Sequence, residues 1–200
     1  MRDDSAKLAT LVGSRLCHDL VSPVGAISNG LELIALAGKP GTEEMNLIEA
    51  SCASATARIN FFRVAFGRAS GEQMIGPREA RKVLEQYCGA GRLSADWQIG
   101  DDKARPEVQL AFLAFLCCES ALPQGGRVQI SNGEQSWRIS ATGPRVNVEK
   151  AIWAQLSSDR LIEDLPPSRV HFACLADLAT QRNRRTKASA GEAAVTIELT

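Results

Sequence analysis

The sequence predicts an α + α/β fold, in which a long antiparallel helical hairpin precedes an α/β sandwich. Apolar residues first repeat at helical spacing over two long segments that are separated by one short loop. Later segments alternate between helical and strand-like patterns. Glycines at positions 67, 71 and 76, spaced by polar residues, mark the change between the two regions. We therefore expect two domains, residues 1–69 and residues 70–200.

The first long helix is predicted over residues 6–37. Its apolar residues are spaced alternately three and four positions apart at Val24, Ile27, Leu31 and Ile34. A loop of glycine, lysine and proline at 38–41 ends this segment. A second helix follows, with a heptad pattern at Met45, Ile48, Cys52, Ala55, Ile59, Phe62 and Phe66. The short loop between the two helices makes them an antiparallel hairpin.

This hairpin is expected to dimerise, because each of its helices has a single neighbour to cover its apolar stripe. A second copy of the chain would complete a four-helix bundle. The residues that we expect at the dimer interface come from both helices, namely Ile27, Leu31, Ile48, Cys52, Ile59 and Phe62.

The second half of the chain is predicted to mix helices with strands. Proline residues open two of the helices, and the Asn132-Gly133 pair favours a tight turn between two strands. We expect helices over residues 77–88, 106–122, 148–156 and 168–180, and strands over residues 93–99, 127–131, 136–142 and 193–199.

The charge balance argues against nucleic acid or a membrane surface as the main partner. The chain has 23 basic and 23 acidic residues, whereas both of those partners select for clustered positive charge. One basic run, at Arg182, Arg184, Arg185 and Lys187, is interpreted as a solvated turn. We expect no apolar stretch long enough to span a membrane and no signal peptide, and therefore a cytoplasmic location.

Several residue types that often carry chemistry are interpreted as packing residues. The six cysteines form no Cys-x-x-Cys pair, so we expect them to be mostly small buried hydrophobes and expect no metal site. Trp97, Trp137 and Trp153 are expected in the core. His171 lies in an apolar helical segment and is interpreted as a packing or surface residue.

The candidate catalytic residue is His18, in the middle of the first helix. It follows the seam position Cys17 and is therefore turned by about 100° to the flank of the helix, where a partner can reach it. Imidazole offers a nucleophilic nitrogen at neutral pH, and the adjacent Asp19 can orient the ring or hold a proton. Pro23 removes one helical hydrogen bond and is expected to bend the helix beside the histidine.

The flank around His18 is expected to be the docking surface for a partner. Its residues are mostly small, namely Ser14, Val21, Ser22, Gly25 and Asn29. Small side chains let a partner helix approach closely, which in-line phosphoryl transfer requires. A single histidine on a helix is nevertheless most often an ordinary surface residue, so this pattern alone does not establish function.

A wider motif carries the functional interpretation. The segment His18–Val24 reads His-Asp-Leu-Val-Ser-Pro-Val. It resembles the phosphoacceptor box of sensor histidine kinases, whose usual form is His-Glu/Asp-Leu-x-Thr-Pro-Leu. Residues 16–32 resemble the ChpT-type histidine phosphotransferases more closely still. The specific part of this resemblance is confined to residues 16–32, and the rest of the chain matches in order and length.

The resemblance implies a second domain related to a kinase ATP-binding domain without its nucleotide site. Residues 115–122 lack the asparagine that would hold Mg²⁺, and residues 140–145 lack the aspartate of the adenine-binding loop. It therefore implies a phosphoryl shuttle without cofactor or metal of its own, with Mg²⁺ supplied by the partner. The partners it implies are the receiver domain of a hybrid histidine kinase upstream and response regulators downstream.

Alternative functions stay open at this point. One is an ATP-dependent kinase with a divergent nucleotide site, and another is a scaffold that binds regulators without chemistry. Asp19 and Ser22 also lie at the offsets that kinases use for aspartyl-phosphatase activity, so phosphoryl flow could run backwards. Arg58 and Arg63 of the second helix could contact either a phosphoryl oxygen or an acidic receiver surface.

Overall fold

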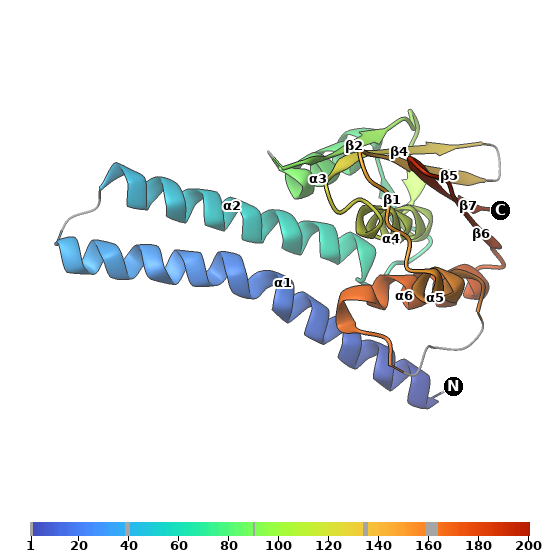
Figure 1. Cartoon of the computed structure of the whole chain (residues 1–200), viewed down its shortest axis with the longest axis horizontal. Coiled ribbons are helices and arrows are strands. Elements are labelled where there is room, and N and C mark those ends of the chain that lie inside the picture. Colours follow the sequence, from blue (N-terminus) through green and yellow to red (C-terminus); the bar gives the residue numbers. More distant parts are fainter. Residues whose placement is uncertain (1, 39–40, 90, 134–135, 159–163) are drawn as a thin grey trace.

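Two long helices form an antiparallel hairpin that projects from an α/β part in the computed structural model (Figure 1). The structure describes residues 2–38, 41–89, 91–133, 136–158 and 164–200. Helix α1 spans Arg2–Ala37 and α2 spans Thr42–Ala65, which confirms the predicted hairpin. Two of the predicted loop residues, 39 and 40, lie outside the described residues.

Close packing within the hairpin depends on Gly30. A Cβ atom at this position would lie 2.6 Å from Cγ1 of Ile48, so only glycine lets the side chain of Ile48 rest against α1. Pro23 is buried, and α1 continues through it as one helix. Figure 1 shows that α1 changes direction near its middle, as the loss of a backbone hydrogen bond at an internal proline predicts.

The heptad pattern of α2 divides between two surfaces. Ala55 and Phe62 are buried within the protomer and Ile48 is half-buried, whereas Ile59 keeps 51% of its surface exposed. The expectation that Phe62 lies in a dimer interface is therefore wrong, whereas the same expectation for the half-buried Ile48 stays a prediction. Phe62 belongs to the core of its own chain, and Ile48 packs against Gly30. A heptad pattern marks an apolar stripe but does not say which neighbour covers each position.

The α/β part contains a five-stranded sheet and the helices that cover it. Its elements are β1 (Met74–Ile75), α3 (Pro77–Cys88), β2 (Leu93–Trp97), β3 (Lys103–Ala104), α4 (Arg105–Ser120), β4 (Gly126–Asn132), β5 (Trp137–Thr142), α5 (Lys150–Ala154), the 3-10 helices η1 (Gln155–Ser157) and η2 (Pro167–Arg169), α6 (Val170–Gln181), β6 (Thr186–Ala190) and β7 (Ala194–Leu199).

The sheet has the strand order β2-β4-β5-β7-β6. Strand β2 pairs parallel with β4, and the other neighbours pair antiparallel. The antiparallel β4–β5 pair confirms the predicted hairpin, but Asn132 pairs with Trp137 at the end of β4, and residues 134 and 135 of the connection lie outside the described residues. Helix α4 lies across one face of the sheet and is buried from Val108 to Cys118, while the other face presents alternating polar side chains to solvent.

The end of α2 is built into the core of the α/β part. Phe61 stacks on Tyr87 and on Phe112, with ring centroids 4.0 Å and 5.0 Å apart. The amide of Gln109 in α4 donates hydrogen bonds to the backbone carbonyls of Ala65 and Gly67. The hairpin is therefore anchored to the α/β part by both apolar packing and buried hydrogen bonds.

The basic run near the C-terminus is the predicted solvated turn only in part. Arg182 lies in a turn, and Arg185 and Lys187 are exposed, but Arg182 and Arg184 bind groups of the fold. Arg182 donates to Oε1 of Gln109 at 2.7 Å, and Arg184 forms an ion pair with Glu107 at 2.8 Å. The run also enters a strand that the sequence pattern missed, β6. These arginines find acceptors on α4, which lies about 75 positions earlier in sequence and is brought close only by the fold.

Other packing expectations are confirmed only in part. Trp97, Trp137 and Trp153 are buried as predicted. Among the cysteines, Cys117, Cys118 and Cys174 are buried, but Cys17 and Cys52 are exposed on the hairpin.

The expectation that no stretch could span a membrane is wrong on length and composition alone. Residues Ser5–Ala37 of α1 meet that requirement, with a mean hydropathy of 1.5 over the most apolar window. This is weak evidence for a membrane span, because long apolar helices also occur in proteins that never enter a bilayer.

Candidate phosphoryl-transfer site

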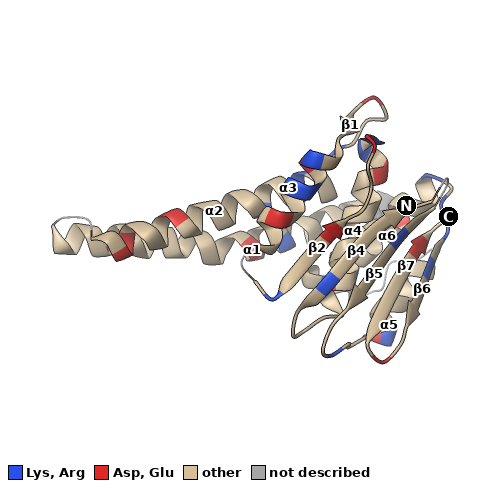
Figure 2. Ribbon diagram, turned by 90° about the horizontal axis from the view of Figure 1, so that it is seen from above, with Lys and Arg blue, Asp and Glu red and all other residues tan. Residues whose placement is uncertain are grey.

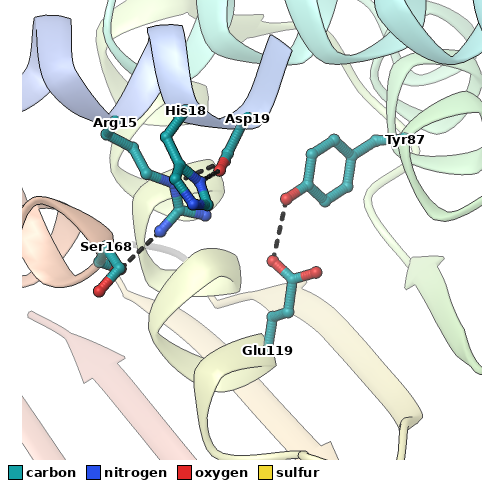
Figure 3. A network of polar contacts seen from close by, with 6 residues as sticks. All are labelled: Arg15, His18, Asp19, Tyr87, Glu119 and Ser168. Carbon is teal, nitrogen blue, oxygen red and sulfur yellow. Dashed lines mark hydrogen bonds and ion pairs between the residues drawn. The ribbon is translucent and has the colours of Figure 1, made fainter. Parts of the chain in front are cut away.

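The side chain of His18 projects from the middle of α1 into solvent, with 85% of its surface exposed. Its Nδ1 atom lies 3.1 Å from Oδ1 of Asp19. The second carboxylate oxygen of Asp19 accepts a hydrogen bond of 2.6 Å from Nε of Arg15, one turn earlier. Arg15 in turn donates to the backbone carbonyl of Ser168 in η2, so the chain of contacts runs from the histidine to the α/β part (Figure 3).

This network sets which nitrogen of His18 is available for chemistry. A carboxylate is an acceptor only, so its contact with Nδ1 favours the tautomer that carries the proton on Nδ1. The lone pair of a neutral ring then lies on Nε2. Because Asp19 is itself held by Arg15, the imidazole is oriented with Nε2 free of the contact with Asp19.

A pocket of about 410 Å³ opens between the two helices beside His18. It is lined by His18, Asp19, Ser22, Pro23 and Ala26 of α1 and by Ala50, Ser51, Ser54 and Arg58 of α2. Of the docking residues predicted from the sequence, only Ser22 lines this pocket. Ser14, Val21 and Asn29 are exposed and Gly25 is half-buried, all outside its lining.

Among the described residues that line this pocket, Arg58 is the one lysine or arginine. Its guanidinium carbon lies 6.0 Å from the centre of the Tyr87 ring. Arg63, the other arginine that the sequence suggested, is exposed and does not line the pocket. The structure therefore places one of the two candidate arginines beside His18 and the other away from it.

Arg58 lies over the ring of Tyr87, which is hydrogen-bonded to Glu119 in the α/β part. The hydroxyl of Tyr87 in α3 donates to Oε2 of Glu119 in α4 at 3.0 Å (Figure 3). Burial, and then the negative charge of Glu119, raise the pKa of Tyr87 well above its ordinary value. Burial raises the pKa of Glu119, and the hydrogen bond from Tyr87 and the charges of Arg15 and Arg58 act in the opposite direction.

Sequence reasoning missed Arg15, Tyr87 and Glu119. The spacing of Arg15 and Asp19, four positions apart on a helix, is a signal that could have identified their ion pair. No comparable signal exists for Tyr87 and Glu119, which come from different helices and meet only in the folded chain. Among the described residues, no group of three or more His, Cys, Asp or Glu side chains could hold a metal ion.

Comparison with known proteins gives this site its context. Residues 77–194 match the family model of the histidine phosphotransferase C-terminal domain. The chain is 37% identical over 148 residues to the protein phosphotransferase ChpT of Brucella abortus (strain 2308), which covers 70% of each chain. A solved structure of a bacterial phosphotransferase aligns with a TM-score of 0.80 and 26% identity, over 98% of this chain and 96% of that one.

The histidine kinase AdeS of Acinetobacter baumannii aligns with a TM-score of 0.43 and 14% identity, over 91% of this chain and 95% of that one. The alignment with the bacterial phosphotransferase shows that the fold, a long helical hairpin followed by an α/β sheet, is that of this class of protein. Within this class, the chain belongs to the ChpT-type histidine phosphotransferases.

Proposed function

We propose that this protein is a cytoplasmic, dimeric phosphorelay intermediate that carries a phosphoryl group on His18. The group comes from the aspartyl phosphate of a receiver domain in a hybrid histidine kinase and passes to the aspartate of a response regulator. The exposed imidazole of His18, held by Asp19 through Nδ1, is the observation that carries the proposal. Membership of the ChpT-type family supports the same chemistry.

The first transfer uses the lone pair on Nε2 of His18. This nitrogen attacks the phosphorus of the aspartyl phosphate, so that an N–P bond forms while the P–O bond to the aspartate breaks. The aspartate leaves as a carboxylate with the bonding electron pair. Meanwhile the Nδ1 proton stays hydrogen-bonded to Asp19, whose negative charge stabilises the positive charge that develops on the ring.

The second transfer is the same step in reverse. A carboxylate oxygen of the response regulator attacks phosphorus, the N–P bond breaks and its electron pair returns to Nε2. Neither step requires a nucleotide, and the partner receiver domain would supply Mg²⁺. The exposed residues Ser14, Val21, Ser22 and Asn29, with Gly25, form the proposed docking surface. Their helical spacing puts them on the same side of α1 as His18, and their mostly small side chains would let a receiver approach.

The proposed dimer is supported by two exposed apolar rows on the hairpin. Val24 and Leu31 of α1 are 55% and 56% exposed, and Met45 and Ile59 of α2 are 40% and 51% exposed. One row consists of Cys17, Val24 and Leu31, and the other of Met45, Cys52 and Ile59. Within each row the residues lie seven positions apart, so each row stays on one side of its helix. Figure 2 shows that the projecting end of the hairpin carries few charged residues.

Both rows lie on the side of the hairpin opposite the pocket beside His18. This follows from the antiparallel arrangement, because on each helix the row and the pocket residues lie on opposite sides of the inter-helix contact. A second copy could therefore cover the apolar rows and leave His18 free. Such a bundle also accounts for the apolar composition of α1 without a membrane.

A transfer experiment tests the proposal. A receiver domain is labelled with radioactive acetyl phosphate, freed of the donor and mixed with the protein. We expect the label to move from the receiver to this chain, and then to a second receiver added later. Retention of all label on the first receiver, with a series of receivers from hybrid kinases of the same organism, would contradict the relay function.

A further inference from the structure

We propose that Arg58 binds the phosphoryl group while it is transferred to and from His18, and that Tyr87 of the α/β part holds Arg58 in place. This inference rests on the proposed transfer through His18. It assigns Arg58 a direct role in transfer and gives the α/β part a role in the chemistry, beyond contact with the partner.

The charge balance of the site leads to Arg58. A phosphoryl group brings almost two negative charges, and its transfer spreads charge over three oxygens that a guanidinium can bind. Arg15 is the other nearby cation, but it already binds one carboxylate oxygen of Asp19 at 2.6 Å. The other oxygen of Asp19 contacts His18. Arg15 is therefore neutralised, and it also donates to the carbonyl of Ser168.

Arg58, by contrast, is left available for an incoming anion. Within the described part of the chain no hydrogen bond or ion pair engages it; its guanidinium lies over the Tyr87 ring, and its charge also acts on the buried Glu119. It lines the same pocket as His18 from the opposite helix. A phosphoryl group on Nε2 of His18 that turned into this pocket would meet the guanidinium, with the hydroxyls of Ser22 and Ser54 on the same lining.

Tyr87 fixes the position of this long side chain. Its ring packs against Phe61 with centroids 4.0 Å apart, and its hydroxyl is tied to Glu119 at 3.0 Å. A cation held over such an anchored ring loses part of its rotamer freedom before the phosphoryl group arrives. Tyr87 is thus a positioning residue, which acts on the phosphoryl group through Arg58 alone.

The test compares two phosphoryl donors for each variant. One donor is a receiver domain labelled with acetyl phosphate, and the other is phosphoramidate, a small molecule that phosphorylates histidine without docking. Arg58→Gln should slow the phosphorylation of His18 by about 100-fold with both donors, the loss typical of one donor to a developing anion. With the receiver, the loss should fall on the maximal rate and leave the concentration for half-maximal rate nearly unchanged.

Two control variants keep the test specific. Arg58→Lys should recover part of the rate, because it restores a cation without the fork of the guanidinium. Arg63→Gln, on the same helix but outside the pocket, should transfer at the wild-type rate with both donors. All variants should keep the wild-type melting temperature within about 3 °C, since the affected side chains lie on the surface or the pocket wall.

The role of Tyr87 is tested by a double-mutant cycle. Tyr87→Leu should slow both reactions less than Arg58→Gln, and adding it to Arg58→Gln should cause no further loss, because Tyr87 acts through Arg58. Tyr87→Phe keeps the ring and should transfer close to the wild-type rate, which separates positioning from damage to the fold. If Tyr87→Leu slowed transfer by the same factor in the wild-type protein and in Arg58→Gln, the positioning role would be overturned.

The two donors also separate this inference from the function on which it depends. Loss with the receiver but a normal rate with phosphoramidate would mean that Arg58 only docks an acidic receiver surface, and would overturn the inference. A normal rate of Arg58→Gln with both donors would overturn it as well. If the wild-type protein took no phosphoryl group from either donor, the proposed function itself would have failed.

Discussion

His18 differs from His171, the second histidine of the chain, in every property that matters for transfer. His18 is exposed and has one ring nitrogen held by Asp19. His171 is 1% exposed, and neither of its ring nitrogens has a hydrogen-bond partner. Burial, and then the positive charges of Arg15 and Arg169, lower the pKa of His171 well below its ordinary value. A receiver domain can reach the first residue and not the second.

Replacing His18 should remove function and leave the fold intact. His18→Ala is expected to abolish phosphoryl uptake from a labelled receiver, because the nucleophile is gone. The free energy of unfolding should change by less than about 0.5 kcal/mol, since the side chain is exposed and packs against little. A transfer assay and a urea titration check both expectations. Uptake of label by this variant at the wild-type rate would contradict the assignment.

Adding bulk at Gly25 should weaken docking without touching the nucleophile. A Cβ atom there meets nothing within 4 Å, so the hairpin can accommodate Gly25→Leu. Gly25 lies seven positions from His18 on the same side of α1, so the new side chain adds bulk to the proposed docking surface, and we expect the receiver concentration for half-maximal transfer to rise about tenfold. Gly25→Ala adds a single methyl group and should have little effect. If Gly25→Leu transferred normally, the docking surface would have to lie elsewhere around His18.

His171 should make the protein less stable in mild acid. The folded chain keeps this histidine neutral, whereas the unfolded chain protonates it below about pH 6.5, so the unfolded state binds more protons there. The free energy of unfolding should therefore fall as the pH drops below 6.5, by up to about 1.4 kcal/mol per pH unit. Urea titrations between pH 7 and 5 give the free energy of unfolding at each pH, and this free energy should depend less steeply on pH for His171→Leu than for the wild type. Identical slopes would show that His171 titrates normally.

At the scale of elements, the sequence predicts where the helices lie along the chain better than which side of each helix contacts which neighbour. The spacing of Val24, Ile27, Leu31 and Ile34 correctly indicates one long helix, because helical periodicity is local information. Which side faces which neighbour depends on the opposing helix, so Phe62 was expected in a dimer and lies in the core. Strand β6 was missed because its residues include Lys187 and alternating small side chains, which give no strong strand pattern.

The exposed rows of the hairpin predict where the dimer can be broken. Ile59→Glu would place an unpaired charge from each chain in the proposed interface, which typically costs several kcal/mol, and should yield monomers. Leu47→Glu is the matched control, because Leu47 lies on the same helix and is 45% exposed but is outside the rows. Light scattering at micromolar concentration distinguishes the two. Monomeric wild-type protein, or dissociation by Leu47→Glu alone, would contradict the proposed interface.

At the scale of the whole molecule, the α/β part is joined to the hairpin by packing that the sequence gives no means to foresee. Gln109 binds the carbonyls at the end of α2, Arg15 reaches Ser168, and Tyr87 lies beside Arg58. These contacts join residues far apart in sequence, so no local pattern reports them. The motif at His18–Val24 could be found from sequence because its function requires a fixed local spacing on one helix.

The chain is expected not to bind ATP. Residues 115–122 offer no asparagine as a metal ligand, and the loop at 140–145 offers no aspartate for adenine. Titration calorimetry with ATP and Mg²⁺ should therefore give no heat of binding at micromolar to sub-millimolar concentrations. Micromolar affinity would revive the alternative of a divergent ATP-dependent kinase, and incubation with labelled ATP alone would then decide whether His18 is its target.

The position of the phosphoryl group on the chain tests the central claim most directly. After incubation with a receiver domain labelled through acetyl phosphate, the protein is digested at neutral pH and its phosphopeptides are located by mass spectrometry. The account predicts a single phosphorylated residue, His18, with a bond that acid breaks and base leaves intact, as expected of a phosphorus–nitrogen bond. An acid-stable phosphate, or a phosphoryl group on any residue other than His18, would contradict it.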